Sequence, residues 1–467
     1  MDEPSPLPLA RAALLGGPLL GAAVGLWVHL GAGLSPAAGW TAAITTVCAV
    51  WWVLEPIPLA ATSLLPFAAF PFAGVLGARE VAQSYGHHLV LLMLAGSIVS
   101  TAMERSGAHR RVAVGLVRLV GGGDGRRLVL GFLLAAAVLS MWMSNTATTV
   151  MLLPVALAVI GAARGEALVV PVLLSVTYGA SIGGSGTPIG TPPNLVLIDR
   201  YREATGTEPS FLGWMRDCLP VVVIMLPLCW RWLVRRVPRS LTVEVGTLGP
   251  WRAEERRVLA VFGLTALAWM TRAEPFGGWS TWLGVQDRVG DSTVAIAAAL
   301  VLFVLPRGTG AGERLLDWET ASKVPWGVFI LIGGGICLGR AFGASGLDAE
   351  LGRALGFLTA WPRWLVIPVV CLCATLATEV TSNTAVANIL MPILGAAAAT
   401  DGGDPMWLML PAVLGVNHSF MLPVASASNA IVYGTGRVST RQMVREGLGL
   451  NLIGAVVISV VCLLTLG

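Results

Sequence analysis

The sequence carries little charge for its length. Only 12% of its 467 residues are charged, whereas soluble domains carry roughly 25%. Hydrophobic residues make up 55% of the chain, and the mean hydropathy is +0.77. Few or no charges interrupt the runs 12–34, 128–143, 219–230 and 447–466. This composition excludes a soluble globular domain and predicts an all-α, polytopic membrane protein in contact with the lipid bilayer.

Lysine is almost absent, because Lys323 is the only lysine among 30 basic residues. The arginines are spread between apolar runs, a distribution that indicates membrane topology and argues against binding of nucleic acid. The first apolar run reaches Leu34, which is longer than the apolar part of a cleaved signal peptide. We therefore expect residues 1–35 to form a retained membrane helix.

Histidine and cysteine are too few, and too scattered, for a metal enzyme. The chain has five histidines, and the adjacent pair His87 and His88 does not share a helix face. Cys371 and Cys373 form a lone C-x-C without a second pair, so the seven cysteines are interpreted as small buried apolar residues. A membrane-embedded hydrolase would need an activated nucleophile or a metal cluster. We expect no enzyme activity and no organic cofactor.

One apolar segment contains an unusual concentration of polar side chains, "SMWMSNTATTVMLLP" at 140–154. Serine and threonine can link packed membrane helices, and this is the simplest interpretation of one such motif. A second interpretation is a re-entrant hairpin, because non-helical backbone at membrane depth persists only where protein groups or a water-filled cavity satisfy it. The two interpretations are separated by whether the motif recurs.

The motif does recur. "SNTATTVMLLP" at 144–154 returns as "SNTAVANILMP" at 382–392, and "GTPPNLVL" at 190–197 is echoed by "ASASNAIV" at 425–432. The proline- and glycine-rich stretch before Asn194 is typical of unwound helix. The sequence therefore predicts an internal repeat with hairpin tips at 144–146 and 382–384 and broken helices at 186–194 and 422–429.

The repeat divides the chain into two halves, residues 36–235 and 257–467, joined by a cytoplasmic linker at 236–256. With the N-terminus in the cytoplasm and re-entrant hairpins at 128–157 and 364–396, most basic residues lie inside, as the positive-inside rule requires. This topology gives about eleven membrane crossings and a C-terminus outside. The two repeats then have opposite orientations, which is typical of secondary transporters with a site at the repeat interface.

The predicted tips suit an anion and a cation bound side by side. The start of each returning half-helix presents backbone N–H groups and a positive dipole end to an anion. Hydroxyl and carbonyl oxygens that remain are ligands suited to Na⁺. No arginine or lysine lies within these motifs, so recognition would depend on dipoles, hydroxyl groups and bound cations.

Five motifs together resemble the divalent anion/sodium symporter (DASS, INDY-like) family. They are "WWVLEPIPLAATSLLP" (51–66), "SMWMSNTATTVMLLP", "GTPIGTPPNLVL", "TEVTSNTAVANILMPI" (378–393) and "SFMLPVASASNAIVYGTG" (419–436). They cover the chain from about residue 40 to its end in the order of the family. The resemblance implies a homodimer in the cell inner membrane, with a scaffold domain and a transport domain that moves like an elevator.

The resemblance also implies site residues. Substrate carboxylates would meet Ser144, Asn145, Thr146, Thr191, Ser382, Asn383, Thr384 and Ser426. A first Na⁺ site would use Ser140, Ser144, Asn145 and Gly190. A second Na⁺ site would use Thr378, Thr381, Asn383 and Ala425, several of them through backbone carbonyls.

One departure from the family pattern concerns the second break, where Ser426-Ala427-Ser428-Asn429 replaces the usual Pro-Pro-Asn. Without these prolines the backbone is expected to be free to re-form helix there. Two nearby carboxylates have open roles. Glu379 is expected to orient the backbone of the second tip, to titrate, or to act as a hydrogen-bonded strut, and Glu55 beside Pro56 is expected to form a structural cap.

The sequence favours a Na⁺-coupled carrier for a small dianion, with a C4 dicarboxylate such as succinate as the preferred substrate. An electroneutral anion exchanger is the alternative, as is a sulfate or citrate carrier of the same fold. A channel is a further alternative, but a channel would favour a continuous polar pore over two paired tips.

Overall fold

The computed structural model describes residues 8–121, 124–163, 166–238, 249–308, 310, 312–399 and 403–466. Throughout these residues the regular structure is helical, and the only extended pairing is an isolated bridge between Pro306 and Arg314. Part of the predicted linker, residues 239–248, lies outside the described residues.

Seven helices of the described chain are long and apolar enough to cross a membrane. They are Ala12–Gly31, Pro36–Leu54, Ala78–Ser106, Glu166–Gly184, Phe211–Arg236, Trp326–Ser345 and Thr440–Leu466. Shorter apolar helices add Leu59–Phe72, Asn145–Gly161, Asp291–Val304, Arg363–Thr378, Asn383–Ala398 and Met406–Asn417. The prediction of an all-α polytopic membrane protein is confirmed. The number of crossings and the orientation of the termini stay predictions.

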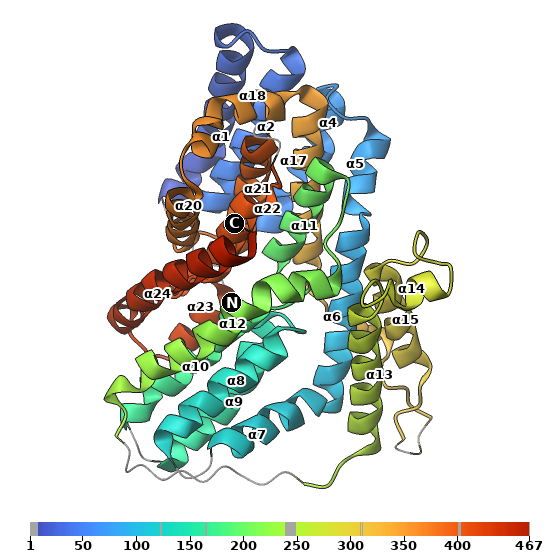
Figure 1. Ribbon diagram of the computed structural model, residues 1–467, viewed down its shortest axis with the longest axis vertical. Helices are drawn as coiled ribbons and strands as arrows, with labels where there is room; N and C mark the ends of the chain where they lie inside the picture. Colours follow the sequence, from blue (N-terminus) through green and yellow to red (C-terminus); the bar gives the residue numbers. More distant parts are fainter. Residues whose placement is uncertain are drawn as a thin grey trace.

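The N-terminal part of the fold forms one end of the molecule (Figure 1). Helix α1 (Pro8–Leu26) packs against α2 (Pro36–Leu54), and the apolar segment that follows is divided into α3 (Leu59–Thr62) and α4 (Leu65–Phe72). Glu55 ends α2 as its C-cap in a left-handed conformation, with φ of 45°, as the expected cap requires. Helix α5 (Ala78–Tyr85) then leads to the long helix α6 (His88–Ser106).

Two helical hairpins stand at the positions of the predicted tips. Helices α8 (Gly125–Ser140) and α9 (Asn145–Ala163) enclose the first turn, and α20 (Arg363–Thr378) and α21 (Asn383–Ala399) enclose the second. Each returning helix begins at the asparagine of its SNT motif. The two turns therefore have the same length and the same register.

Two helices are interrupted, again at equivalent places. Helix α10 (Glu166–Gly184) is followed by a break and then α11 (Pro192–Thr205), and α22 (Met406–Asn417) is followed by a break and then α23 (Ala427–Gly434). The second break is present, and helix resumes within the predicted range 422–429, at Ala427. Residues 418–426 contain only the short 3₁₀ turn η3 (Pro423–Ala425), although Pro-Pro is absent at the start of α23.

The remaining elements connect and flank these hairpins. Amphipathic helices α7 (Ala108–Gly121) and α18 (Leu347–Leu355) follow α6 and α17 (Trp326–Ser345) respectively. The long helices are α12 (Phe211–Leu233), α13 (Ala253–Met270), α15 (Asp291–Val304) and α24 (Thr440–Leu466). Short helices are α14 (Gly278–Trp282), α16 (Trp318–Ala321), α19 (Phe357–Ala360) and the 3₁₀ turn η2 (Val234–Arg236).

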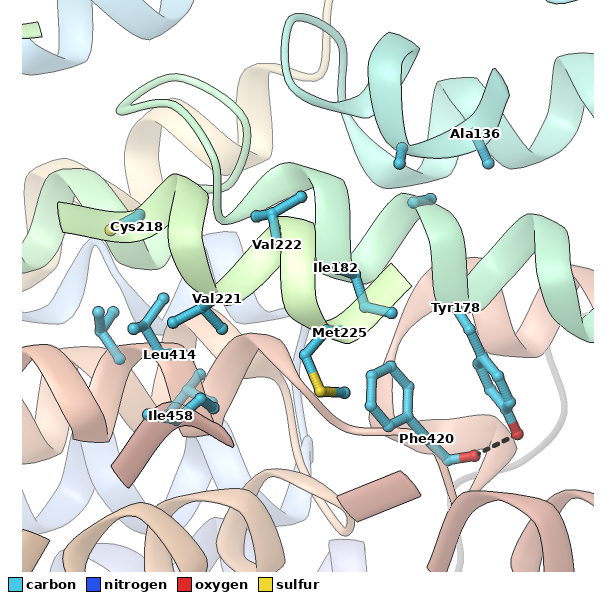
Figure 2. Packing of buried hydrophobic residues seen from close by; sticks show 14 of the residues in the cluster. Ala136, Tyr178, Ile182, Cys218, Val221, Val222, Met225, Leu414, Phe420 and Ile458 are labelled. Atoms are coloured by element: carbon cyan, nitrogen blue, oxygen red, sulfur yellow. Dashed lines mark hydrogen bonds between the residues drawn. The ribbon is translucent and has the colours of Figure 1, made fainter. Parts of the chain in front are cut away.

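The two halves share one apolar core around the breaks. Helices α10 and α12 of the first half pack against α22 and α24 of the second, and Figure 2 shows Val221 of α12 facing Leu414 and Ile458 and Met225 of α12 facing Phe420. In the same view the Tyr178 hydroxyl donates to the carbonyl of Phe420 at 2.8 Å. The hairpins and broken helices therefore form a single packed body rather than two separate ones.

Candidate binding cavity

The first tip is held by its own polar side chains. The Ser140 hydroxyl donates to the Asn145 carboxamide oxygen at 2.5 Å, across the turn between α8 and α9. The Ser144 hydroxyl accepts from the Ala147 N–H at 3.2 Å, which is the hydrogen bond of a helix N-cap. This bond explains why α9 starts at Asn145, and the first bond fixes the direction of the Asn145 oxygen.

The second tip repeats this arrangement. The Thr378 hydroxyl donates to the Asn383 carboxamide oxygen at 2.5 Å, and the Ser419 hydroxyl approaches the same oxygen at 3.4 Å. Ser140 and Thr378, the two donors, are both fully buried. Each tip therefore presents an asparagine whose oxygen is turned toward the broken helix of its own half.

Each break is closed by a second asparagine. The Asn194 amide donates to the carbonyls of Gly184 and Thr187, at 3.0 and 2.8 Å. The Asn429 amide donates to the carbonyls of Ser419 and Leu422, at 3.3 and 3.1 Å. Because a helix end leaves carbonyls without intrahelical partners, these amides satisfy groups that the break would otherwise expose.

Hydrogen bonds between the halves connect the two breaks. The Asn417 amide of α22 donates to the Asn194 oxygen at 2.8 Å, and the Thr191 hydroxyl donates to the Asn417 oxygen at 3.1 Å. In the other direction, the Thr177 hydroxyl of α10 donates to the Asn429 oxygen at 2.6 Å. The geometry of each half-site therefore depends on a residue from the other half.

Glu379 holds the second break in place of the missing prolines. Its buried carboxylate accepts from the backbone N–H groups of Phe420, Met421 and Leu422, at 2.8 to 3.1 Å. It also accepts from the Asn451 amide of α24 at 2.6 Å. An extended segment with three unpaired N–H groups is costly when buried, and the carboxylate pairs all three. Of the roles considered for Glu379, this geometry supports a hydrogen-bonded strut, which joins the end of α20 to the second break.

The start of α23 is capped by a side chain rather than by prolines. Ser426 is extended, with φ of −150°, and its hydroxyl accepts from the Asn429 N–H at 3.1 Å. Helix α11 starts instead with Pro192 and Pro193, which have no N–H. The N–H groups of Ala427 and Ser428, the first two residues of α23, have no acceptor among the described residues. The two breaks therefore have a similar arrangement of helices, but only the second presents backbone N–H groups at the first two positions of its returning helix.

One cavity of about 600 Å³ brings tips and breaks together. All eight residues predicted to bind substrate line it, as do Gly190 and Ala425 of the predicted cation sites. These eight residues are Ser144, Asn145, Thr146, Thr191, Ser382, Asn383, Thr384 and Ser426. The predicted cation ligands Ser140, Thr378 and Thr381 are buried and are not among the lining residues. The Thr381 hydroxyl turns away from Asn383 and donates to the Trp52 carbonyl of α2 at 3.2 Å.

Charged side chains enter this cavity from one wall. Glu55, Glu104 and Lys323 are the charged residues among those that line it, and all three are exposed. They come from the end of α2, from α6 and from the segment after α16. The hairpins and broken helices contribute hydroxyl, carboxamide and backbone groups, but no charged side chain, to the described lining.

Sequence reasoning missed four buried hydroxyl groups near the first break. Thr148 and Thr149 lie on α9, Ser181 lies on α10 and Ser185 follows it, and none has a hydrogen-bond partner among the described residues. A buried hydroxyl without a partner is costly, and its oxygen is free for a cation or a water. Ser181 and Ser185 lie four residues apart in a polar stretch, which is a helical spacing that the sequence displays.

Metal-binding clusters of other types are not found in the described chain. No group of three or more His, Cys, Asp or Glu residues lies close enough to hold a metal ion there. The His88 side chain contacts Glu208 at 3.1 Å, and the seven cysteines are free, with only Cys373 exposed.

The chain is similar to known membrane transporters. Residues 49–415 match the model of the citrate transporter family. The sodium-dependent dicarboxylate transporter SdcS of Staphylococcus aureus strain MW2 is 37% identical over 442 residues, covering 90% of this chain and 84% of SdcS. SdcS of strain USA300 is 36% identical over the same length. The structure of the Alcanivorax borkumensis YdaH transporter is similar in fold, with a TM-score of 0.59 and 17% identity over 82% of this chain and 88% of YdaH.

Proposed function

Since the chain belongs to the citrate transporter family, we propose that it moves a small dicarboxylate, a C4 dianion such as succinate, across the membrane together with Na⁺. The relative SdcS is named as a sodium-dependent dicarboxylate transporter, which supports this choice of substrate and cation. The observation that carries the proposal is the meeting of both SNT tips and both helix breaks in one cavity.

The cavity offers the dianion two half-sites. Carboxylate oxygens would accept from the hydroxyl and carboxamide groups of Ser144–Thr146 at one tip and Ser382–Thr384 at the other, and from Thr191 and Ser426 at the breaks. Helices α9, α11, α21 and α23 all begin at this cavity, so their positive dipole ends favour negative charge. Two half-sites facing one another suit a substrate with a carboxylate at each end.

Charge balance supports coupling to cations. A dianion carried by elements without a positively charged side chain in the cavity would be desolvated with its charge uncompensated, which is costly. Two Na⁺ ions beside the tips would neutralise it. The first would use Ser140, Ser144, Asn145 and Gly190, and the second would use Thr378, Thr381, Asn383 and Ala425.

The mechanism we propose is alternating access of the elevator type, in a homodimer in the inner membrane. The transport domain consists of α8–α12 and α20–α24, and the scaffold consists of α1–α6 and α13–α17. With the N-terminus in the cytoplasm and the C-terminus outside, α6 runs inward, and the exposed Glu104 and Lys323 mark the cytoplasmic mouth of the cavity. The structure then corresponds to an inward-facing state.

Uptake into proteoliposomes tests this function. We expect labelled succinate to accumulate when a Na⁺ gradient is imposed, and to accumulate much less with K⁺ in place of Na⁺. Uptake that requires succinate inside the vesicles and ignores Na⁺ would establish an exchanger instead. If the gradient drives accumulation of no dicarboxylate, of no citrate and of no sulfate, the proposal is wrong.

Alanine at Asn145 and at Asn383 tests the site. Each substitution removes the oxygen that Ser140 or Thr378 orients. We expect the apparent affinities for succinate and for Na⁺ to fall about tenfold in each variant. These affinities are measured from the rise in unfolding temperature with ligand concentration. The control is Glu350→Gln on α18, whose carboxylate pairs with Arg353 at the surface and does not line the cavity. Unchanged affinities in both alanine variants would show that the site lies elsewhere.

Proline at the second break tests the role of its free N–H groups. Ser426 has ψ of 151°, which a following proline tolerates, so Ala427→Pro should fold normally and lose only the N–H. We expect an unchanged unfolding temperature and succinate binding weakened by roughly tenfold, as for loss of one hydrogen bond to a charged group. Ala427→Ser keeps the N–H and is the matched control. Equal affinities in the two variants would mean that this N–H does not contact the substrate.

A further inference from the structure

Two side chains of the proposed transport domain fill glycine notches on α17 of the scaffold. Gly335 and Gly339 lie one turn apart on this helix. A Cβ atom on Gly335 would lie 2.1 Å from the Asn388 carboxamide oxygen of α21, and one on Gly339 would lie 1.3 Å from a guanidinium nitrogen of Arg200 on α11. Positions 335 and 339 therefore accommodate only glycine while Asn388 and Arg200 occupy their present places against α17.

Both side chains also form hydrogen bonds with the α17 backbone. The Asn388 amide donates to the Leu331 carbonyl and the Arg200 guanidinium donates to the Ile336 carbonyl, each at 3.2 Å. The two residues are buried, with 2% and 5% of their surface exposed. Arg200 is neutralised by Asp199 and Glu203 of its own helix, so the guanidinium is buried with its charge paired.

The contact is not fully satisfied, because the Asn388 oxygen has no partner among the described residues. A buried carboxamide oxygen without a donor raises the free energy of this arrangement. An incompletely satisfied contact of this kind is expected where α17 and the transport domain separate during the transport cycle, rather than at a permanent interface.

The equivalent surface of α6 faces the cavity. Gly96 and Ser100 precede the C-cap glycine of α6, Gly107, by the same intervals at which Gly335 and Gly339 precede Gly346 of α17. Gly96 and Ser100 line the cavity. When the two repeats are aligned, Val150 on α9 is equivalent to Asn388 on α21. Thr435, at the end of α23, is equivalent to Arg200 on α11. Val150 is 53% exposed.

We propose that Asn388 and Arg200 form a latch on α17 that holds the transport domain in the state with the cavity open along α6. In the opposite state the transport domain leaves these notches and covers α6, with Val150 and Thr435 at Gly96 and Ser100. This inference rests on the proposed function. Because the latch on α17 is polar and charge-paired while the α6 contact involves only Val150 and Thr435, the state with the cavity open along α6 is the resting state of the empty transporter.

Thiol labelling tests the latch without any substrate. A Ser97→Cys reporter lies on the cavity face of α6, and in detergent-solubilised protein a maleimide reaches it only while that face is open. We expect Asn388→Ala to lower the ratio of open to covered states roughly fivefold, the change that one hydrogen bond gives to an equilibrium, and so to slow labelling by up to that factor. Gly339→Ala should slow labelling further, because its Cβ cannot coexist with seated Arg200.

Two controls separate the latch from general damage. Gly343→Ala lies one turn further along α17, where the nearest atom to the new Cβ is 3.8 Å away, and should label like the unmodified protein. In an Arg200→Ala background, Gly339→Ala should have no further effect, since the clash is gone. Equal labelling of Gly339→Ala and Gly343→Ala, or an undiminished effect of Gly339→Ala without Arg200, overturns the proposal. Because labelling needs no substrate, failed succinate uptake would leave this result intact and would count against the proposed function alone.

Discussion

Glu379→Gln is expected to reduce transport by at least about 100-fold. The carboxylate pairs three backbone N–H groups and the Asn451 amide, and hydrogen bonds to a charged group are worth roughly 1.5–3 kcal/mol each. Glutamine has only one acceptor oxygen and would direct an amide NH₂ group toward backbone N–H groups. Loss of about 3 kcal/mol from the loop that carries Ala425 and Ser426 corresponds to roughly a 100-fold loss of the competent conformation. Initial rates of Na⁺-driven succinate uptake measure this effect.

The matched control is Glu350→Gln on α18, where the carboxylate pairs with Arg353 at the surface. An exposed pair of this kind contributes little, so uptake and unfolding temperature should not change. A Glu379→Gln variant that transports like the Glu350→Gln variant would mean that the second break is held by other groups.

Gly183→Ala is expected to lower the free energy of unfolding by about 3 kcal/mol, the upper end of the usual cost of overpacking. Helix α10 passes α8 so closely that a Cβ on Gly183 would lie 2.2 Å from the Ala137 carbonyl oxygen and 2.5 Å from its Cα. These atoms belong to the backbone, so no side-chain rotation relieves the clash. The two helices must separate, which also displaces the first break just after Gly184. Thermal unfolding in detergent measures the loss.

Gly161→Ala on the neighbouring helix α9 provides the comparison. Its Cβ would have no atom within 4 Å, and alanine is the better helix former, so stability should stay the same or rise slightly. If Gly183→Ala unfolds at the same temperature as Gly161→Ala, the close approach of α8 and α10 is not needed for stability.

The hairpins and breaks were predictable because polar and helix-breaking residues stand out in apolar sequence. Ser144–Thr146, Ser382–Thr384 and the prolines before Asn194 each interrupt a run that would otherwise be continuous helix. Their recurrence at nearly equal spacing predicted two half-sites at matching positions of the repeat. The structure places all of the predicted substrate residues on one cavity, while the assignment of individual contacts to substrate and Na⁺ stays a prediction.

The support of the second break was not predicted, because it comes from elsewhere in the chain. The sequence at Ser426–Asn429 lacks the usual prolines, and the break is maintained by Glu379, which precedes Phe420 by 41 residues. Arg200 and Asn388 were missed for a similar reason. Asp199 and Arg200 follow an apolar run and are adjacent opposite charges, but only the packed structure shows that Arg200 faces a glycine of α17.

The cross-links between the two breaks bear on leakage of ions. Asn417 binds Asn194, Thr177 binds Asn429, and Tyr178 binds the Phe420 carbonyl, all through buried hydrogen bonds. Exposing one cation site alone would break these bonds, at about 1 kcal/mol each, and would also open the shared apolar core. Release of Na⁺ from one half-site while the other half-site stays closed is therefore disfavoured. In the proposed mechanism, the same bonds that shape the two half-sites would make them move together, so that a gradient of Na⁺ is not dissipated without substrate.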